Sequence, residues 1–98
     1  MERVNKLWRM CCLSDHSNKR IIYCLKDGEK TVSQIEDELK GYPKNLIDSR
    51  LKDLEEYEIV ESCNEEEETY RINQDGFKKA IEDSMEILKE YETNFHLK

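Results

Sequence analysis

Two adjacent cysteines near the start of the chain have residue types that could sense oxidants. Cys11 and Cys12 lie close in sequence to Arg9, Lys19 and Arg20, and nearby positive charge keeps a cysteine in its reactive thiolate form. The alternative is that both thiols fill core positions, because free cysteines are among the most buried residues. The sequence leaves redox sensing and burial as two open interpretations of this pair.

Other chemistry has little support in the sequence. Cys24 and Cys63 complete the set of four cysteines, and no pair has the C-x-x-C spacing of a zinc site. Ser14, Asp15 and His16 are neighbours in the chain and therefore cannot face one another as a catalytic triad. We expect no enzyme activity, no cofactor and no metal.

Charge is distributed unevenly along the 98 residues, whose net charge is −7. Residues 40–52 carry four Lys or Arg against one Asp, whereas residues 53–76 carry one Arg against ten Asp or Glu. Clustered basic side chains are what a phosphate backbone attracts. The segment 40–52 is therefore the candidate DNA contact, and the run of glutamates from Glu65 to Glu68 is either a solvated loop or an acidic surface for a basic partner.

The hydrophobic spacing predicts that a helix-turn-helix at about 33–57 carries the basic segment. Ser33 and Glu36 have the spacing of a capping box, and Gly41 and Pro43 separate two helices. Residues 59–72 then alternate as a β-hairpin around the glutamates. We predict a mostly α fold with a small β-hairpin (α+β), which is a winged helix-turn-helix whose second helix, 43–57, enters the major groove of DNA.

Three further helices are predicted, at about 3–12, 16–26 and 74–94. The first has an apolar face of Val4, Leu7, Trp8 and Cys11. The last has a longer stripe, composed of Phe77, Ala80, Ile81, Ser84, Met85, Leu88 and Tyr91. A stripe of this length exceeds what one small core covers, so we expect a homodimer through the C-terminal and N-terminal helices. The alternative is packing wholly within one chain.

The whole chain, 1–98, is expected to form a single winged-helix domain. No apolar run is long enough to cross a bilayer and no signal peptide is evident, which points to a cytoplasmic protein. In a reducing cytosol the cysteines would be thiols, although a hyperthermophile could keep disulfides.

Several short motifs occur in an order that resembles winged helix-turn-helix transcriptional regulators of the HxlR, ArsR and MarR kind. The motifs most similar to the HxlR group are Lys40-Gly41, Leu46, Arg50-Leu51 and Leu54-Glu55, and those more similar to the ArsR group are Leu13-Ser14-Asp15, Arg20-Ile21-Ile22 and Leu25. The resemblance covers residues 13–77. It implies a homodimer that binds a pseudo-palindromic double-stranded DNA operator with one recognition helix in each half-site.

By position in that family pattern, the DNA-binding residues would lie on and before the second helix. Lys44, Asn45, Asp48 and Ser49 would face base edges, and Lys40, Arg50 and Lys52 would lie near phosphates. Asn45 suits adenine and Lys44 suits guanine. Asp48 could accept a hydrogen bond from cytosine or could equally be a solvent-facing residue that repels phosphate.

The sequence departs from this family pattern in the hairpin. Regulators of this class usually carry Arg or Lys there, but Glu65, Glu66, Glu67 and Glu68 occupy the tip, where carboxylates would oppose binding to phosphates. Either the wing turns away from DNA, or the domain is a protein-interaction module that binds no DNA. The HxlR group also often has an N-terminal redox cysteine, and Cys11 and Cys12 lie in the comparable region.

Overall fold

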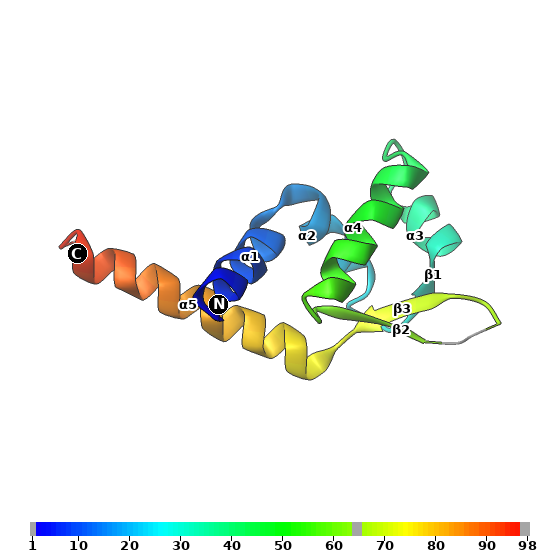
Figure 1. Ribbon diagram of the computed structural model, residues 1–98. Coiled ribbons are helices and arrows are strands. Elements are labelled where there is room, and N and C mark those ends of the chain that lie inside the picture. The colour runs from blue at the N-terminus through cyan, green and yellow to red at the C-terminus, as the bar shows by residue number, and fades with distance from the viewer. Residues whose placement is uncertain (1, 64–65, 97–98) are drawn as a thin grey trace.

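Five helices and three short strands form the protein in a computed structural model, which describes residues 2–63 and 66–96. The elements are α1 (Glu2–Ser14), α2 (His16–Cys24), β1 (Lys30–Thr31), α3 (Val32–Glu38), α4 (Lys44–Glu56), β2 (Val60–Cys63), β3 (Thr69–Ile72) and α5 (Gln74–Asn94). Helices α2, α3 and α4 cluster beside the strands, and α5 runs past α1 and projects beyond it (Figure 1). The predicted helix-turn-helix and hairpin are confirmed.

One hydrophobic core joins the helix-turn-helix to the strands. Helices α3 and α4 contribute Ile35, Ile47, Leu51 and Leu54, all fully buried. Other apolar side chains with at most 2% exposure include Ile21, Leu25, Ile59, Val60 and Ala80. Those in α4 recur at the three- and four-residue spacing that places them on one face of the helix. The opposite face of α4 is consequently held toward solvent.

The sheet has a third strand that the sequence analysis did not predict. The segment 29–32 contains β1, which pairs antiparallel with β3 through Lys30 opposite Tyr70 and Thr31 opposite Thr69. The strand order is β1-β3-β2. Two residues are too few to show the alternation by which strands are recognised. Pairing with β1 ties the end of β3 nearest the wing loop to the start of α3.

The cap of α3 differs from the predicted box at Ser33 and Glu36. The Thr31 hydroxyl accepts from the backbone N–H of Gln34 at 3.1 Å, and the Gln34 side-chain oxygen accepts from the backbone N–H of Thr31 at 2.8 Å. Helix α3 begins at Val32 because β1 ends at Thr31, whose extended ψ of 161° suits a cap. Pro43 occupies the N-cap position of α4 without a side-chain hydrogen bond, and the helix itself begins at Lys44.

A tight turn connects α4 to the wing. The backbone N–H of Ile59 donates to the carbonyl of Leu54 at 2.9 Å, and that of Glu58 donates to Glu55 at 3.0 Å. This pair of bonds is a Schellman motif, and Glu58 has the positive φ of 61° that such an ending requires. The first turn of α5 packs on this point, because a Cβ built on Gly76 would lie 1.7 Å from the Glu58 carbonyl oxygen.

Helices α1 and α5 of one chain are joined by ion pairs. Arg9 Nη1 lies 2.7 Å from Asp83 Oδ2, and Lys6 Nζ lies 3.3 Å from Glu86 Oε2. Part of the apolar face predicted for α1 is exposed, with Leu7 at 38% and Trp8 at 53%. The side chain of Val4 and residues Asn64 and Glu65 lie outside the described part of the chain.

The apolar stripe of α5 divides into two faces. Ala80, Asp83 and Ile87 are buried. The exposed face carries Ile81, Met85, Leu88, Tyr91 and Phe95, at 41–70% exposure. The sequence could not separate these faces, because both contain apolar residues at helical spacing and the buried one includes a charged residue.

Candidate nucleic-acid interface

Helix α4 presents polar side chains on the face opposite its buried residues. Gly41 turns the chain with a φ of 97°, and Pro43, with a ψ of 146°, starts the helix at Lys44. Asn45, Ser49 and Lys52 follow one another at intervals of four and three residues, so they share one face. All three are exposed, as is Lys44 in the first turn. The sequence-predicted residues Lys44, Asn45, Ser49 and Lys52 are thus brought together on one accessible surface.

Lys40 is also exposed and lies in the turn that precedes α4. The two remaining predicted contacts, Asp48 and Arg50, are half-buried at the two edges of the helix. Asp48 lies on the edge nearest the wing, where its charge contributes to the raised pKa of Tyr70. The exposed face therefore carries three lysines, counting Lys40, and no acid until Glu56 in its last turn.

Arg50 points away from that face and toward α2. Its Nη1 atom lies 3.7 Å from Asp15 Oδ2, and its Nε atom is buried without a hydrogen-bond partner within the described residues. Asp15 also caps α2 by accepting from the backbone N–H of Asn18 at 3.0 Å. Sequence spacing could not reveal this contact, because Asp15 and Arg50 are far apart in the chain.

The wing is acidic in its described part, and its one basic residue is already paired. Arg71 on β3 lies directly opposite Glu61 on β2, and Arg71 Nε donates to Glu61 Oε1 at 2.7 Å. The Tyr70 hydroxyl donates to Glu68 at 2.6 Å. The pKa of Tyr70 is raised mainly by burial and secondly by its hydrogen bond to the Glu68 carboxylate. The sequence analysis missed the Glu61–Arg71 pair, although the antiparallel register of a hairpin could have indicated it.

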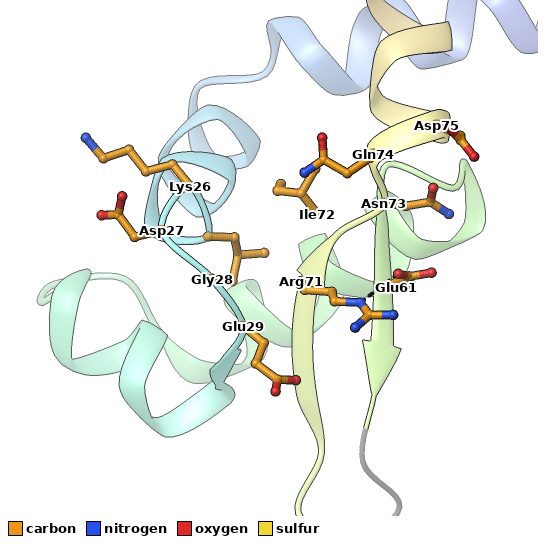
Figure 2. A pocket seen from close by; sticks show the side chains of 11 residues that line it. Lys26, Asp27, Gly28, Glu29, Glu61, Arg71, Ile72, Asn73, Gln74 and Asp75 are labelled. Carbon is orange, nitrogen blue, oxygen red and sulfur yellow. Dashed lines mark hydrogen bonds and ion pairs between the residues drawn. The ribbon is translucent and has the colours of Figure 1, made fainter.

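A hollow of about 770 Å³ lies at the base of the wing, beside the start of α5 (Figure 2). Glu61 and Arg71 meet on one side of it, and Asp27, Glu29 and Asp75 surround the rest. The Thr69 hydroxyl lies 2.8 Å from Glu29, and hydrogen bonds from Cys63 and Thr69 lower the pKa of that carboxyl. The hollow therefore has an acidic rim, which is unsuited to phosphate.

The four cysteines are all free thiols and occupy different environments. Cys11 is exposed, whereas Cys12 is buried and its pKa is raised to about 11, first by burial and then by the negative charge of Asp53. Cys24 is buried, as its apolar position predicts, and burial with a hydrogen bond to Glu38 raises its pKa to about 11. The pair at 11 and 12 thus contains one accessible and one shielded thiol.

The described residues were also compared with what a metal site and a membrane-spanning helix require. In residues 2–63 and 66–96, no three His, Cys, Asp or Glu side chains gather as they would around a metal ion. No helix in this part of the chain is both long and apolar enough to span a membrane.

Known protein families and solved structures share this architecture. A sequence model of the HxlR-like helix-turn-helix family matches residues 12–96. The diamide-treated YodB of B. subtilis has 26% identity and a TM-score of 0.66, over 88% of this chain and 87% of its own. No curated protein sequence matches the chain.

Two structures of lower identity share the fold. An ArsR-like transcriptional regulator from Rhodococcus sp. RHA1 has 20% identity and a TM-score of 0.74, over 95% of this chain and 88% of its own. The homodimeric winged helix-turn-helix DNA-binding domain of Mb0332 from Mycobacterium bovis has 22% identity and a TM-score of 0.64, over 95% and 85%.

Two observations assign the chain to a family. The fold is a helix-turn-helix with a wing, and the family match covers residues 12–96. The chain belongs to the HxlR-like helix-turn-helix family, whose members are winged-helix, DNA-binding transcriptional regulators rather than enzymes.

Proposed function

We propose that this protein regulates transcription by binding a specific double-stranded DNA operator as a homodimer, with α4 of each protomer in one half-site. The observation that carries the proposal is the exposed face of α4. Its polar residues lie opposite a row of fully buried ones, so the core holds them rigidly in one orientation. A rigid helix face with lysines and an amide suits the major groove, which admits an α-helix.

Within that proposal, the residues of α4 divide between base edges and phosphates. Asn45 would pair with adenine and Lys44 with guanine, with Ser49 beside them. Lys40 and Lys52 would contact phosphates, which fix the position of the protein without reading sequence. Arg50 could join them only by leaving Asp15, and Asp48 would meet cytosine or solvent.

The acidic wing sets the expected geometry of the complex. Carboxylates beside DNA oppose the release of counterions that provides most non-specific affinity, and the wing's Arg71 is engaged by Glu61. We therefore expect α4 to provide recognition while the wing contributes little or turns away from the duplex.

The exposed stripe of α5 supports the homodimer. Soluble monomers rarely leave a large contiguous apolar patch uncovered. The residues from Ile81 to Phe95 form an exposed apolar stripe, and the C-terminal part of α5 projects beyond α1 (Figure 1). The Mb0332 domain, which has this fold, is homodimeric. Pairing of two α5 helices, with the exposed Leu7 and Trp8 of α1 alongside, would set the spacing of the half-sites.

Charge reversal on α4 tests the proposal. We expect Lys44→Glu and Lys52→Glu each to weaken operator binding at least about fivefold at low salt, since a contact of this kind contributes about 1–3 kcal/mol. Lys79→Glu, an exposed α5 position with the same change of charge, is the matched control. Equal affinities for Lys44→Glu and Lys79→Glu would show that α4 is not the reading element.

The second candidate, a protein-interaction module, rests on the acidic wing alone, and the relatives offer no support for a basic protein partner. It makes the opposite prediction, because such a module would show no saturable binding to duplex DNA at about 50 mM salt, where electrostatic binding is strong.

Thiol sensing is a further candidate that would add to DNA binding. Cys11 is exposed, and YodB is known in a diamide-treated and a reduced form. The raised pKa of Cys12 makes Cys11 the better sensor. A change in DNA affinity on diamide treatment that Cys11→Ser abolishes would support sensing, and the same response in Cys11→Ser would exclude that role.

A further inference from the structure

A second cavity, of about 430 Å³, lies where α2 meets the end of α1 and the first turn of α5. The lining residues are Leu13, Lys19, Ile22, Tyr23, Lys26 and Phe77. The volume falls within the roughly 300–1,000 Å³ that is typical of pockets for small molecules. The lining includes neither the exposed stripe of α5 from Ile81 to Phe95 nor the exposed Leu7 and Trp8 of α1.

Three of the six lining side chains are apolar and are held in place by the core. Leu13, Ile22 and Phe77 are half-buried and pack against the hydrophobic core. They come from three different helices, so the packing of α1, α2 and α5 fixes their relative positions. An apolar ligand could bury its surface against them without first ordering the protein, which lowers the cost of binding.

Tyr23 contributes an aromatic ring that the core does not use. It is 70% exposed, although it lies on α2 between the buried residues Ile21 and Cys24. Phe77 contributes a second ring from α5. Aromatic rings pack favourably on one another in offset and edge-to-face arrangements. Two rings in one small cavity therefore favour a ligand with an aromatic body.

The charge beside the cavity is positive, although the chain as a whole carries −7. Residues 16–26 contain Lys19, Arg20 and Lys26 and no Asp or Glu, and all three basic side chains are exposed. Within residues 2–63 and 66–96, no ion pair joins any of them to a carboxylate. Lys19 and Lys26 line the cavity and no acidic residue does. An anion in the cavity would therefore meet two unpaired cations and no opposing charge.

Lys26 lines both this cavity and the acidic hollow at the base of the wing. Figure 2 shows its side chain extending away from Glu29 and Glu61. The acidic rim of the hollow therefore does not hold the Lys26 ammonium in an ion pair, and this charge is available on the side of the apolar cavity.

We propose that this cavity binds a small organic anion, a monocarboxylate with an aromatic body. Tyr23 and Phe77 would cover the ring of the ligand, and the ammonium groups of Lys19 and Lys26 would contact its carboxylate. Binding of this ligand goes beyond the proposed function and does not rest on it.

Amide NMR spectra of the isotope-labelled full chain test the site without DNA and detect weak binding. The probe is 1-naphthylacetate, which is ionised at pH 7 and is titrated at fixed protein concentration. Three compounds are matched controls. Naphthylethanol has the same ring without a charge, naphthylethylamine has the opposite charge, and acetate has the carboxylate without the ring.

We expect saturable shifts of the amide signals of Ile22, Tyr23 and Phe77, with a dissociation constant of about 1 mM, the usual affinity for a ligand of this size. Naphthylethanol should bind about fivefold more weakly, because two exposed charge contacts are absent. Naphthylethylamine should bind more weakly still, and acetate should cause no saturable shift.

Substitutions separate the charged contacts from the aromatic ones. Lys19→Gln with Lys26→Gln should weaken binding of naphthylacetate about fivefold and leave that of naphthylethanol unchanged. Tyr23→Ala should weaken both ligands about fivefold. Lys79→Gln with Lys89→Gln removes two exposed lysines of α5 that do not line the cavity, and it should change neither affinity. All five side chains are exposed, so the fold should tolerate these changes.

Four results would overturn the proposal. These are no saturation below about 10 mM; equal affinity for naphthylacetate and naphthylethanol; equal weakening by the two double-lysine variants; or binding by the Leu88→Glu chain alone. The last result would show that a second copy of the chain covers the cavity. None of them would affect the proposal of DNA binding, because no DNA is present in the titration.

Discussion

At the scale of single residues, the contact between α1 and α5 depends on a shielded ion pair. Arg9 and Asp83 retain 19% and 8% side-chain exposure, and their atoms lie 2.7 Å apart. A charge this far from water is costly unless its partner is present. The pair Lys6–Glu86 joins the same helices but is more exposed, at 29% and 57%. The two pairs should therefore differ in their contribution to stability.

Asp83→Ala is expected to lower the free energy of unfolding by about 3 kcal/mol, the lower end of the range for a broken buried pair, because it leaves Arg9 shielded and unpaired. Lys6→Ala should cost less than about 1 kcal/mol, as is usual for exposed pairs. Urea unfolding measures both. Equal losses would show that solvent screens the two pairs alike.

Cys11 and Cys12 should differ in their reactivity. The pKa of Cys12 is raised from 9.0 to about 11, so its reactive thiolate is scarce at pH 8 and increases only as pH approaches 11. A short pulse of iodoacetamide at pH 8, followed by peptide mass spectrometry, should therefore label the exposed Cys11 and leave Cys12 largely unmodified. Preferential labelling of Cys12 would contradict the environment described for it.

At the scale of elements, the turn between α4 and the wing is fixed by contact with α5. Gly76 lies in the first turn of α5, and the Glu58 carbonyl occupies the space where a Cβ would lie. Asn73 caps this helix by accepting from the backbone N–H of Gly76 at 3.0 Å. The orientation of α5 relative to α4 depends on this close approach.

Gly76→Ala should destabilise the fold by about 1–3 kcal/mol, since the new methyl group meets backbone rather than a flexible side chain. The direction of the change in stability tests the contact, because Gly→Ala at an unobstructed helix position usually stabilises by about 1 kcal/mol. Lys79→Ala, an exposed control on the same helix, should change stability by less than about 0.5 kcal/mol. A raised melting temperature for Gly76→Ala would contradict the contact.

The elements were predictable where local signals agreed. Asn73 and the spacing of apolar residues located α5 at 74–94, as the structure has it. The cap at Thr31 was misplaced because pairing with β3, a segment far along the chain, decides where α3 begins. The exposed residues of α4 followed from helical spacing, whereas the Arg50–Asp15 contact depends on the packing of α2 against α4.

At the scale of the whole molecule, the two faces of α5 have different surroundings. One face, with Ala80, Asp83 and Ile87, is buried, and its Asp83 pairs with Arg9 of α1, whereas the face from Ile81 to Phe95 is apolar and exposed. The molecule is elongated, with extents of 49 × 27 × 23 Å. A second copy laid along this stripe would bury it and place two α4 helices on one assembly, as a pseudo-palindromic site requires.

Leu88→Glu should shift the protein to monomer in sedimentation velocity at concentrations where the unmodified chain is a dimer, because it places a charge in the apolar stripe. Thr93→Glu adds the same charge at an exposed α5 position outside that stripe, and it should leave the dimer intact. A monomeric unmodified chain, or equal dissociation by both substitutions, would contradict a dimer through α5.

The central claim is that α4 of a dimeric regulator reads a specific operator. Selection of bound sequences from random duplex DNA, at about 50 mM salt, tests it most directly. We predict enrichment of a pseudo-palindrome whose half-sites lie about one helical turn, or a multiple of it, apart. The account would be contradicted if no sequence is enriched and the protein shows no saturable affinity for duplex DNA.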